Sequence, residues 1–588
     1  MSEKTRKEKQ DLSIKKVLSY TERLWVIMLL SGLIGAILFM LIYGVKILNP
    51  TYEDWLFEGG DLTQHYLGWI FYRRSDWHFP LGLIDNILGN IKISVMYTDS
   101  LPLFAIFFKL LSPILPDTFQ YYGIMGIITF ILNGSFASLL IYRFSKNGIF
   151  CIIGSTLYTV CPAILQRLYG HESLSCHYVL ILGLILWVYQ NYEWKKKWQN
   201  YAMSPILWGV LGILAVSIHI YYLPMIYCFL LGCFITDIFK YKKYLRPFLS
   251  FISITLTSLL SMWILGAFYT KSDIAADGLG GLSANINTFW NPIETGGNGM
   301  IGHWAKGSSF LKTLPVNNGQ YEGYAYLGFG VIFGILFALM VLLNHVFSCK
   351  TRPDKAAKAV LCKRKIWIIA GFAVFLVSFF FAVSPSCYIN ETKIYDIYYS
   401  EDITKYMAAF RATGRFAWVG MYLIFTLVIY CLSRIRTKIL LIGAIAVCVG
   451  LQFTDMKEQI KSRKWYKEDH TYTSPLSDPR WEQLAKGCDK FVGLNYDQPQ
   501  PYIYNFSIFA YKHNMSINHF HIARPPFNDI LKQYDNNIKR LTSGNADKTS
   551  LYVFLSDEYI PQIEGTSIYE LDGFYVVKFP NQNDPLKE

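Results

Sequence analysis

Apolar blocks about as long as a lipid bilayer is thick recur along the first three quarters of this chain. A helix rises about 1.5 Å per residue, so roughly 20 residues cross the hydrocarbon core of a membrane. Eleven blocks have this character: residues 25–47, 119–142, 149–165, 174–190, 201–218, 221–239, 248–268, 325–347, 366–385, 416–433 and 439–454. The pattern predicts a mainly α-helical polytopic membrane protein with about eleven spanning helices.

The composition agrees with this prediction. Only 16% of the 588 residues are charged and 53% are hydrophobic, whereas about a quarter of the residues in a soluble protein are charged. A soluble cytosolic enzyme and a disordered chain are therefore excluded. The net charge is +13, and in a membrane protein such an excess is expected in cytoplasmic loops. We expect the lipid bilayer, and no nucleic acid, as a partner.

The stretch 101–118 decides the topology. It is apolar, but prolines 102, 113 and 116 lie at its two ends and Lys109 lies in its middle. We therefore expect a helix that lies along the membrane surface instead of crossing it. With a cytoplasmic N-terminus, this assignment gathers the lysines and arginines in the cytoplasmic loops, as the positive-inside rule requires. If the stretch crossed the membrane, every later basic cluster would lie outside.

The predicted organisation has three parts: a cytoplasmic tail (1–24), a membrane core (25–454) and an extracytoplasmic C-terminal domain (455–588). The core carries three outer loops, at residues 49–118, 269–324 and 386–415. The last part contains short β-like runs at residues 490–494, 551–555 and 574–579. Such runs between polar segments predict a small α/β domain.

Polar residues collect in the first of these loops, around the sequence GGDLTQHYLGW. Glu58 and Asp61 are three residues apart and would share one face of a helix. A carboxylate at this position could act as a catalytic base or a metal ligand, with Gln64 and His65 as hydrogen-bonding neighbours. The alternative is an interfacial helix with Asp61 as its N-cap. The sequence leaves both interpretations open.

Two further polar groups are expected on the same side of the membrane. Arg167, His171 and Glu172, in the sequence RLYGHESL, could orient a phosphate or a sugar hydroxyl; the alternative is a solvated turn capped by Glu172. Glu322 lies in GQYEGYAYLGFG, just before the next helix. There its carboxylate could face the same cavity as Asp61.

The third outer loop ends in FRATGRFAW, which places Arg411 and Arg415 four residues apart. On one helical face, two arginines would form a bidentate site for a phosphate or pyrophosphate. The alternative is a pair of arginines that extend to the membrane interface. Arginines at an outer helix end run against the positive-inside bias, which favours the functional interpretation slightly.

These segments together resemble the GT-C superfamily of membrane glycosyltransferases. Its members carry an acidic catalytic residue in the first outer loop, followed by a helix parallel to the membrane, and some have an outer C-terminal domain. Here Asp61 and the stretch 101–118 take these places. The segments GGDLTQHYLGW, RLYGHESL, GQYEGYAYLGFG and FRATGRFAW also resemble an uncharacterised bacterial multi-pass family with a glycosyltransferase-like core.

The resemblance implies a transferase that moves a sugar from a polyprenyl-phosphate-linked donor to an extracytoplasmic glycan, lipid or protein. Asp61 would be the catalytic base or a metal-associated carboxylate. Some relatives use a divalent cation and others do not, which leaves Mg²⁺ or Mn²⁺ open. The resemblance also implies the bacterial cytoplasmic membrane as the location.

Two other functions fit a chain of this kind. A transporter or lipid flippase would place ionisable groups near the bilayer midplane, and the predicted spans are nearly free of them. A non-catalytic cell-envelope assembly protein would use the C-terminal domain for binding. Both stay alternatives to the transferase.

Overall fold

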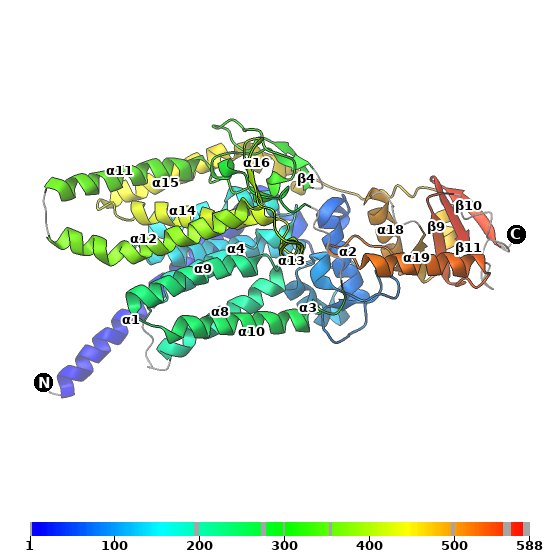
Figure 1. The fold of residues 1–588 in the computed structure, drawn as a ribbon, viewed down its shortest axis with the longest axis horizontal. Helices are drawn as coiled ribbons and strands as arrows, with labels where there is room; N and C mark the ends of the chain where they lie inside the picture. Colours follow the sequence, from blue (N-terminus) through cyan, green and yellow to red (C-terminus); the bar gives the residue numbers. More distant parts are fainter. Residues whose placement is uncertain are drawn as a thin grey trace.

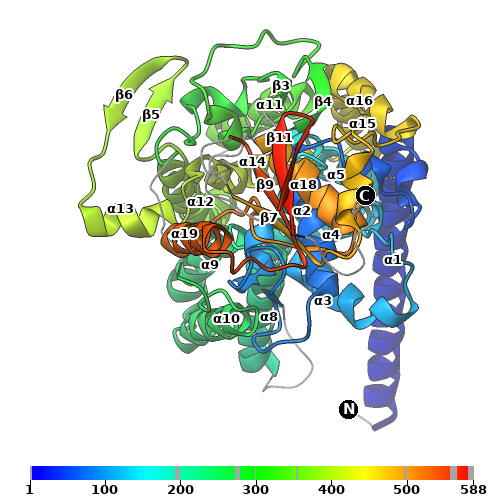
Figure 2. The same ribbon diagram turned by 90° about the vertical axis from the view of Figure 1, so that its right-hand side faces the viewer.

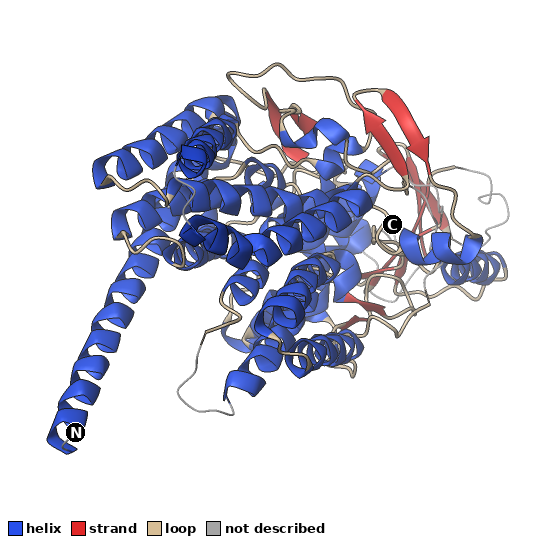
Figure 3. Ribbon diagram, turned by 60° about the vertical axis from the view of Figure 1, so that its left-hand side comes forward, coloured by secondary structure: helices blue, strands red, loops and turns tan. Residues whose placement is uncertain are grey.

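The computed structural model describes residues 3–192, 199–271, 278–297, 300–351, 355–494, 500–556 and 566–579. The molecule is elongated, with a helical bundle at one end and the C-terminal domain at the other (Figure 1). Helix α2 (Gly60–Arg74) lies between these two parts. The long helix α1 (Glu3–Tyr43) runs along the bundle and projects beyond it at its N-terminal end (Figure 3).

Eight helical segments among the described residues are long and apolar enough to cross a membrane. They are Arg23–Tyr43 of α1, Tyr122–Tyr142 (α4), Tyr201–Ile218 of α8 (Gln199–Ile218), Tyr222–Tyr241 (α9, Tyr222–Thr236, and the turn after it), Leu245–Ile264 (α10), Lys365–Ala382 of α12 (Lys355–Ala382), Thr413–Leu432 (α14, Ala417–Leu432, and the turn before it) and Lys438–Asp455 (α15). This content is compatible with a membrane protein.

Three of the eleven predicted blocks give shorter apolar helices, Gly148–Thr159 (α5), Glu172–Val188 (a turn followed by α7) and Phe329–Met340 of α11 (Phe329–Thr351). In the first case the block 149–165 is interrupted. Pro162, which has no N–H to donate, begins the separate short helix α6 (Pro162–Arg167). The predicted number of eleven spans therefore exceeds the eight that the described helices support.

The outward faces of the bundle carry large apolar side chains. On α10, Leu256 is 62% exposed and Trp263 is 51% exposed, and on α12 Phe372 is 62% exposed. A water-soluble protein would cover so continuous an apolar surface. Inside the bundle, glycine permits close packing, because a Cβ at Gly35 of α1 would lie 2.4 Å from the backbone oxygen of Phe130 on α4.

The 49–118 loop folds into α2, two short strands and α3 (Pro102–Leu110). The strands β1 (Leu83–Ile84) and β2 (Ile93–Ser94) pair antiparallel. Helix α3 has nine residues, which is too short to cross a bilayer, as the sequence predicts. It exposes Leu103, Phe107 and Leu110 and buries Lys109, whose amine lies 4.2 Å from the ring centre of Tyr72.

The C-terminal part is the predicted small α/β domain. Its five-stranded sheet has the order β10-β11-β9-β7-β8, formed by Ser567–Leu571, Phe574–Lys578, Ser550–Phe554, Lys490–Gly493 and Ser516–Ile517. The strand β7 pairs in parallel with β8 and β9, and β11 pairs antiparallel with β9 and β10. The three predicted strand runs are the three central strands. Helices α17 (Arg480–Ala485), α18 (Gln500–Lys512) and α19 (Phe527–Thr542) accompany the sheet.

This domain is fixed to the 49–118 loop by hydrogen bonds. The backbone N–H of Ile517 donates to Asn86 O at 2.9 Å, and that of Ala523 donates to Tyr97 O at 2.9 Å. Helix α18 packs on α2, and the sheet lies over both when the molecule is viewed from its C-terminal end (Figure 2). The chain between β8 and α19 therefore lies against the loop segment that precedes α3.

The remaining elements belong to the other two loops and the linker. In the 269–324 loop the strands β3 (Thr295–Gly297) and β4 (Met300–Ala305) pair antiparallel. The 386–415 loop forms the hairpin β5 (Ser386–Ile389) and β6 (Thr392–Asp396), followed by α13 (Glu401–Ala408). Helix α16 (Lys457–Ser462) leads toward the C-terminal domain.

Candidate functional site

The most buried part of the candidate site is a histidine–glutamate pair. Helix α2 presents His65, whose Nδ1 lies 2.7 Å from Glu172 Oε1. Both side chains are buried, so Glu172 does not cap a solvated turn as the alternative interpretation supposed. Burial disfavours the charged imidazole, but the Glu172 carboxylate outweighs it and raises the pKa of His65 to about 9.

Asp99 and two more histidines surround this pair. Asp99 Oδ2 lies 3.9 Å from His171 Nε2, and Asp99 Oδ1 lies 3.4 Å from His219 Nε2. The rings of His65 and His171 are 5.0 Å apart, and those of His171 and His219 are 5.3 Å apart. Burial lowers the pKa of His171 well below its usual value, and the positive charges of His65 and Arg415 lower it further.

The backbone of the 98–101 segment sets the position of Asp99. Asp99 has φ 54° and Leu101 has φ 46°, in the left-handed region that leucine occupies only at a cost. The segment also packs directly on α2, since a Cβ at Gly68 would lie 2.5 Å from Ser100 Oγ. Ser100 Oγ donates to His65 O at 2.7 Å. These contacts hold Asp99 beside His65.

Asp61 lies in the first turn of α2, next to this cluster. The N-cap of the helix is Gly59, which makes no side-chain capping bond, so the alternative interpretation of Asp61 as the N-cap is wrong. Within the described part of the chain, no group donates a hydrogen bond to its carboxylate. Burial raises the pKa of Asp61 to about 6; His65 opposes this shift, and nearby carboxylates, Glu322 among them, add to it.

Glu58 does not share a helical face with Asp61. Helix α2 begins only at Gly60, two residues after Glu58, and the chain turns through Gly59 at φ 97° and Gly60 at φ 66°. The Glu58 side chain is 46% exposed and lies 4.0 Å from His470. The expected pair of neighbouring carboxylates is therefore replaced by one partly buried acid, Asp61, and one exposed acid, Glu58.

Glu322 is held between two buried arginines. Arg167 Nη2 lies 2.8 Å from Glu322 Oε2, and Arg415 Nε lies 2.8 Å from the same oxygen. The backbones approach closely there, because a Cβ at Gly414 would lie 2.6 Å from Gly323 Cα. Burial would raise the pKa of Glu322, but the two guanidinium groups outweigh it and lower the pKa to about 2. Glu322 is thus an ionised partner of the arginines.

The two arginines of the 386–415 loop do not form the predicted pair on one helical face. Helix α14 begins only at Ala417, and Arg415 lies in the preceding 3₁₀ turn while Arg411 lies before that turn. Arg415 is buried against Glu322 and Tyr221, whereas Arg411 is exposed. Arg411 and Arg415 are four residues apart, but no helix connects them, because the chain turns at Ala412, with φ −84° and ψ 65°.

The C-terminal domain covers the site. Tyr504 of α18 is close enough for the Asp61 charge to add to the rise that burial produces in its pKa. His521 has a pKa lowered by burial and by the positive charges of His65 and Arg411. Arg524 donates a hydrogen bond to Ala409 O. The site is therefore made by the 49–118 loop, the ends of the bundle and the C-terminal domain together.

The family comparison matches this division of the chain. A model described as a domain of unknown function, DUF6311, covers residues 32–457, and one described as the DUF6311 C-terminal domain covers residues 480–579. The chain belongs to the DUF6311 family. No curated protein matches it. In this DUF6311 chain the first matched region holds the bundle and most of the site, and the second holds the α/β domain that covers the site.

Among the residues that the structure describes, His65, Asp99 and His171 of the DUF6311 chain form a group that could hold a metal ion, because their ligand atoms all lie within 4.8 Å of one another. The sequence analysis named Asp61 as the candidate metal ligand, and Asp61 is not in this group. It missed Asp99 and His219 altogether. The only sequence signals for them were an aspartate just before the Leu101–Pro102 step and a histidine between two apolar blocks.

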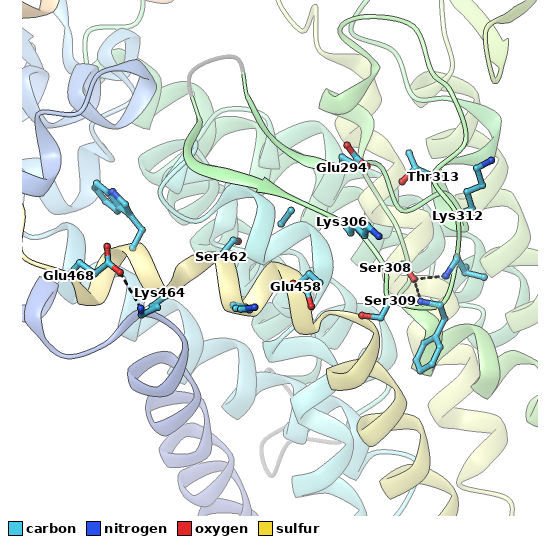
Figure 4. Close-up of a pocket in the computed structure, with 15 residues that line it drawn as sticks. Glu294, Lys306, Ser308, Ser309, Lys312, Thr313, Glu458, Ser462, Lys464 and Glu468 are labelled. Carbon is cyan, nitrogen blue, oxygen red and sulfur yellow. Dashed lines mark hydrogen bonds and ion pairs between the residues drawn. The ribbon is translucent and has the colours of Figure 1, made fainter.

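One cavity of the DUF6311 chain lies elsewhere. It has a volume of about 1040 Å³ and lies between α16 and residues 305–313 (Figure 4). Its walls mix lysines with glutamates and include the ion pair of Lys464 and Glu468, whose charged atoms are 3.6 Å apart. No predicted site residue lines it. Gln64 of α2 is buried, and no hydrogen bond among the described residues joins its side chain to the cluster.

The protonation of Asp61 gives a direct prediction. A hydrophobic carbodiimide reacts with a protonated carboxyl group, so its reaction with Asp61 in chelator-washed protein should increase as the pH falls, with a midpoint near the pKa of about 6. Mass spectrometry of the peptide that contains Asp61 measures the modification, and Asp61→Asn is the control that removes it. A constant yield between pH 5 and pH 7.5 would contradict the raised pKa.

Proposed function

We propose that this protein is a membrane glycosyltransferase that moves a sugar from a polyprenyl-phosphate donor to an acceptor hydroxyl outside the cytoplasm. The observation that carries the proposal is Asp61. It is a partly buried carboxylate with a raised pKa and no hydrogen-bond donor among the described residues, and it lies in the same site as Arg415. A general base needs a pKa near the working pH and a free lone pair.

The proposed reaction is a direct displacement. The acceptor oxygen forms a bond to the anomeric carbon while its proton passes to the Asp61 carboxylate. The bond between the anomeric carbon and the phosphate oxygen breaks, and its electron pair leaves with polyprenyl phosphate. Positioned cationic donors stabilise such a leaving phosphate in a buried site.

Arg415 supports the leaving group in this scheme. Its Nε is taken by Glu322, but its two Nη atoms have no hydrogen-bond partner among the described residues. Arg167 differs, since both of its Nη atoms contact Glu322. We assign phosphate binding to Arg415 and the positioning of Glu322 to Arg167. The exposed apolar faces of α10 and α12 are where the lipid tails of a membrane would lie.

Purified protein reconstituted in vesicles with a polyprenyl-phosphate sugar labelled in the sugar tests the proposal. Protein-dependent release of polyprenyl phosphate, with label passing to an added acceptor or to water, is the expected result. Movement of the intact lipid-linked sugar between leaflets without cleavage would support a flippase instead. Absence of both across a panel of sugars would favour the assembly protein.

The sidedness of the site is a separate prediction. Glu58 beside the site and Lys242 between α9 and α10 are both exposed, and the proposal places them on opposite sides of the membrane. In spheroplasts, a membrane-impermeant maleimide should label Glu58→Cys but label Lys242→Cys only after permeabilisation, each compared with the parent chain. Labelling of both from one side would overturn the topology.

A further inference from the structure

Two histidines and an aspartate, His65, His171 and Asp99, lie close together, and no hydrogen bond in the described part of the chain joins any two of them. His171 Nε2 and Asp99 Oδ2 are 3.9 Å apart, which is too long for a hydrogen bond. Two ligands that each lie about 2.1 Å from one ion are roughly 3.4 Å from each other. The ligand atoms of His65, Asp99 and His171 all lie within 4.8 Å of one another. They would have to move slightly closer together to reach the separation of two ligands on one ion.

The surrounding contacts select one nitrogen of each histidine. Nδ1 of His65 is occupied by Glu172 at 2.7 Å, which leaves Nε2 as the nitrogen from which a metal ion would displace the proton. Metal-binding histidines usually donate their second ring N–H to a carboxylate in this way, which fixes the tautomer and the ring. Nδ1 of His171 lies 3.3 Å from Ser173 Oγ, which leaves the Nε2 that faces Asp99.

His219 orients the carboxylate instead of joining it as a ligand. Its Nδ1 accepts a hydrogen bond from the backbone N–H of Tyr221 at 3.2 Å, so its proton lies on Nε2. That Nε2 faces Asp99 Oδ1 at 3.4 Å. One oxygen of Asp99 is thus satisfied by His219, and the other is directed toward His171.

We propose that His65 Nε2, His171 Nε2 and Asp99 Oδ2 bind one divalent transition-metal ion of the Zn²⁺ class. Imidazole nitrogens suit Zn²⁺, Fe²⁺ and Ni²⁺, whereas Mg²⁺ is held by oxygen ligands. Two histidines and one carboxylate leave coordination positions open for water or a ligand oxygen. Glu172, His219 and Ser173 position the three ligands. This inference does not rest on the proposed function, because metal binding is measured without any transfer reaction.

Metal analysis of the tag-free full-length protein in detergent tests the proposal. We expect close to one equivalent of a first-row transition metal after purification without chelator. After stripping, Zn²⁺ should rebind saturably at one per chain and raise the unfolding temperature, and Mg²⁺ in large excess should do neither. Glu172→Gln should weaken Zn²⁺ binding by about 10- to 100-fold, as loss of such supporting carboxylates does elsewhere.

Variants of the ligands separate this site from adventitious binding. His171→Gln and Asp99→Asn should each weaken Zn²⁺ binding by more than Glu172→Gln does. His177→Gln is the matched control, because His177 is also buried but is bonded to Tyr422 at 2.8 Å and lies outside the group. Unchanged binding in both ligand variants, or displacement of Zn²⁺ by equimolar Mg²⁺, would overturn the proposal.

A spectroscopic measurement on the wild-type chain covers the case in which the ligand variants fail to fold. Bound Co²⁺ should show the visible bands of nitrogen and oxygen ligation, without a thiolate charge-transfer band. A thiolate band would assign the metal to cysteines and contradict the site, as would the absence of any saturable Co²⁺ spectrum.

Discussion

Replacement of Asp61 with Asn is expected to reduce sugar transfer by at least about 10²- to 10⁴-fold, the usual contribution of a general base. The amide cannot accept the acceptor proton at neutral pH. The fold should be unaffected, because no hydrogen bond of the Asp61 carboxylate holds the described part of the structure together. The rate of polyprenyl phosphate release and the unfolding temperature, measured on the same preparation, separate the two effects.

Glu58→Gln is the matched control for this experiment. It lies three residues away on the same loop, but its side chain is 46% exposed and its nearest charged partner is 4.0 Å away. We expect transfer at the wild-type rate. A wild-type rate in Asp61→Asn would remove Asp61 from the mechanism, and an equal loss in both variants would point to an effect on the loop and not on catalysis.

The Glu322→Gln variant is expected to lower the free energy of unfolding by about 3–5 kcal/mol, the usual cost of removing one partner from a buried ion pair. Both Arg167 and Arg415 contact this carboxylate at 2.8 Å, and the neutral amide would leave two buried guanidinium groups without a counter-charge. The unfolding temperature in detergent measures the loss.

Two comparisons make that result specific. Glu391→Gln replaces an exposed acid of the 386–415 loop and should leave the unfolding temperature unchanged. The double variant Glu322→Gln with Arg415→Gln should recover part of the loss, because one of the unpaired charges is gone. If Glu322→Gln unfolds at the wild-type temperature, the cluster does not stabilise the fold.

The lowered pKa of Glu322 also predicts how the stability of the fold changes at acid pH. Since the Glu322 pKa falls from an ordinary 4.5 to about 2, its contribution to stability is complete above pH 4.5. That contribution is lost as the pH falls toward 2, where the folded carboxylate itself becomes protonated.

Much of the fold could be predicted from the sequence because the signals were local. Each of the eleven apolar blocks became helical, and the three β-like runs became the central strands of the C-terminal sheet. The number of spans could not be fixed in this way. Pro162 ends one block early, and helix length was read from composition alone.

The site was only partly predictable, because its geometry depends on contacts distant in the chain. Asp61, His65 and Glu172 were each identified, but the bond between His65 and Glu172 joins residues 107 positions apart. Asp99 was missed because its direction depends on a left-handed turn and on the close approach at Gly68. The prediction that Arg411 and Arg415 share one helical face was wrong, because a turn is present where the spacing assumed a helix.

The stereochemistry of transfer tests the central claim most directly. If Asp61 activates an acceptor hydroxyl for one direct displacement, the product must have the opposite anomeric configuration to the polyprenyl-phosphate donor. NMR of the product made by the wild-type protein, before any equilibration, measures that configuration. Inversion is the predicted result; retention, which a single back-side displacement cannot give, would contradict the account.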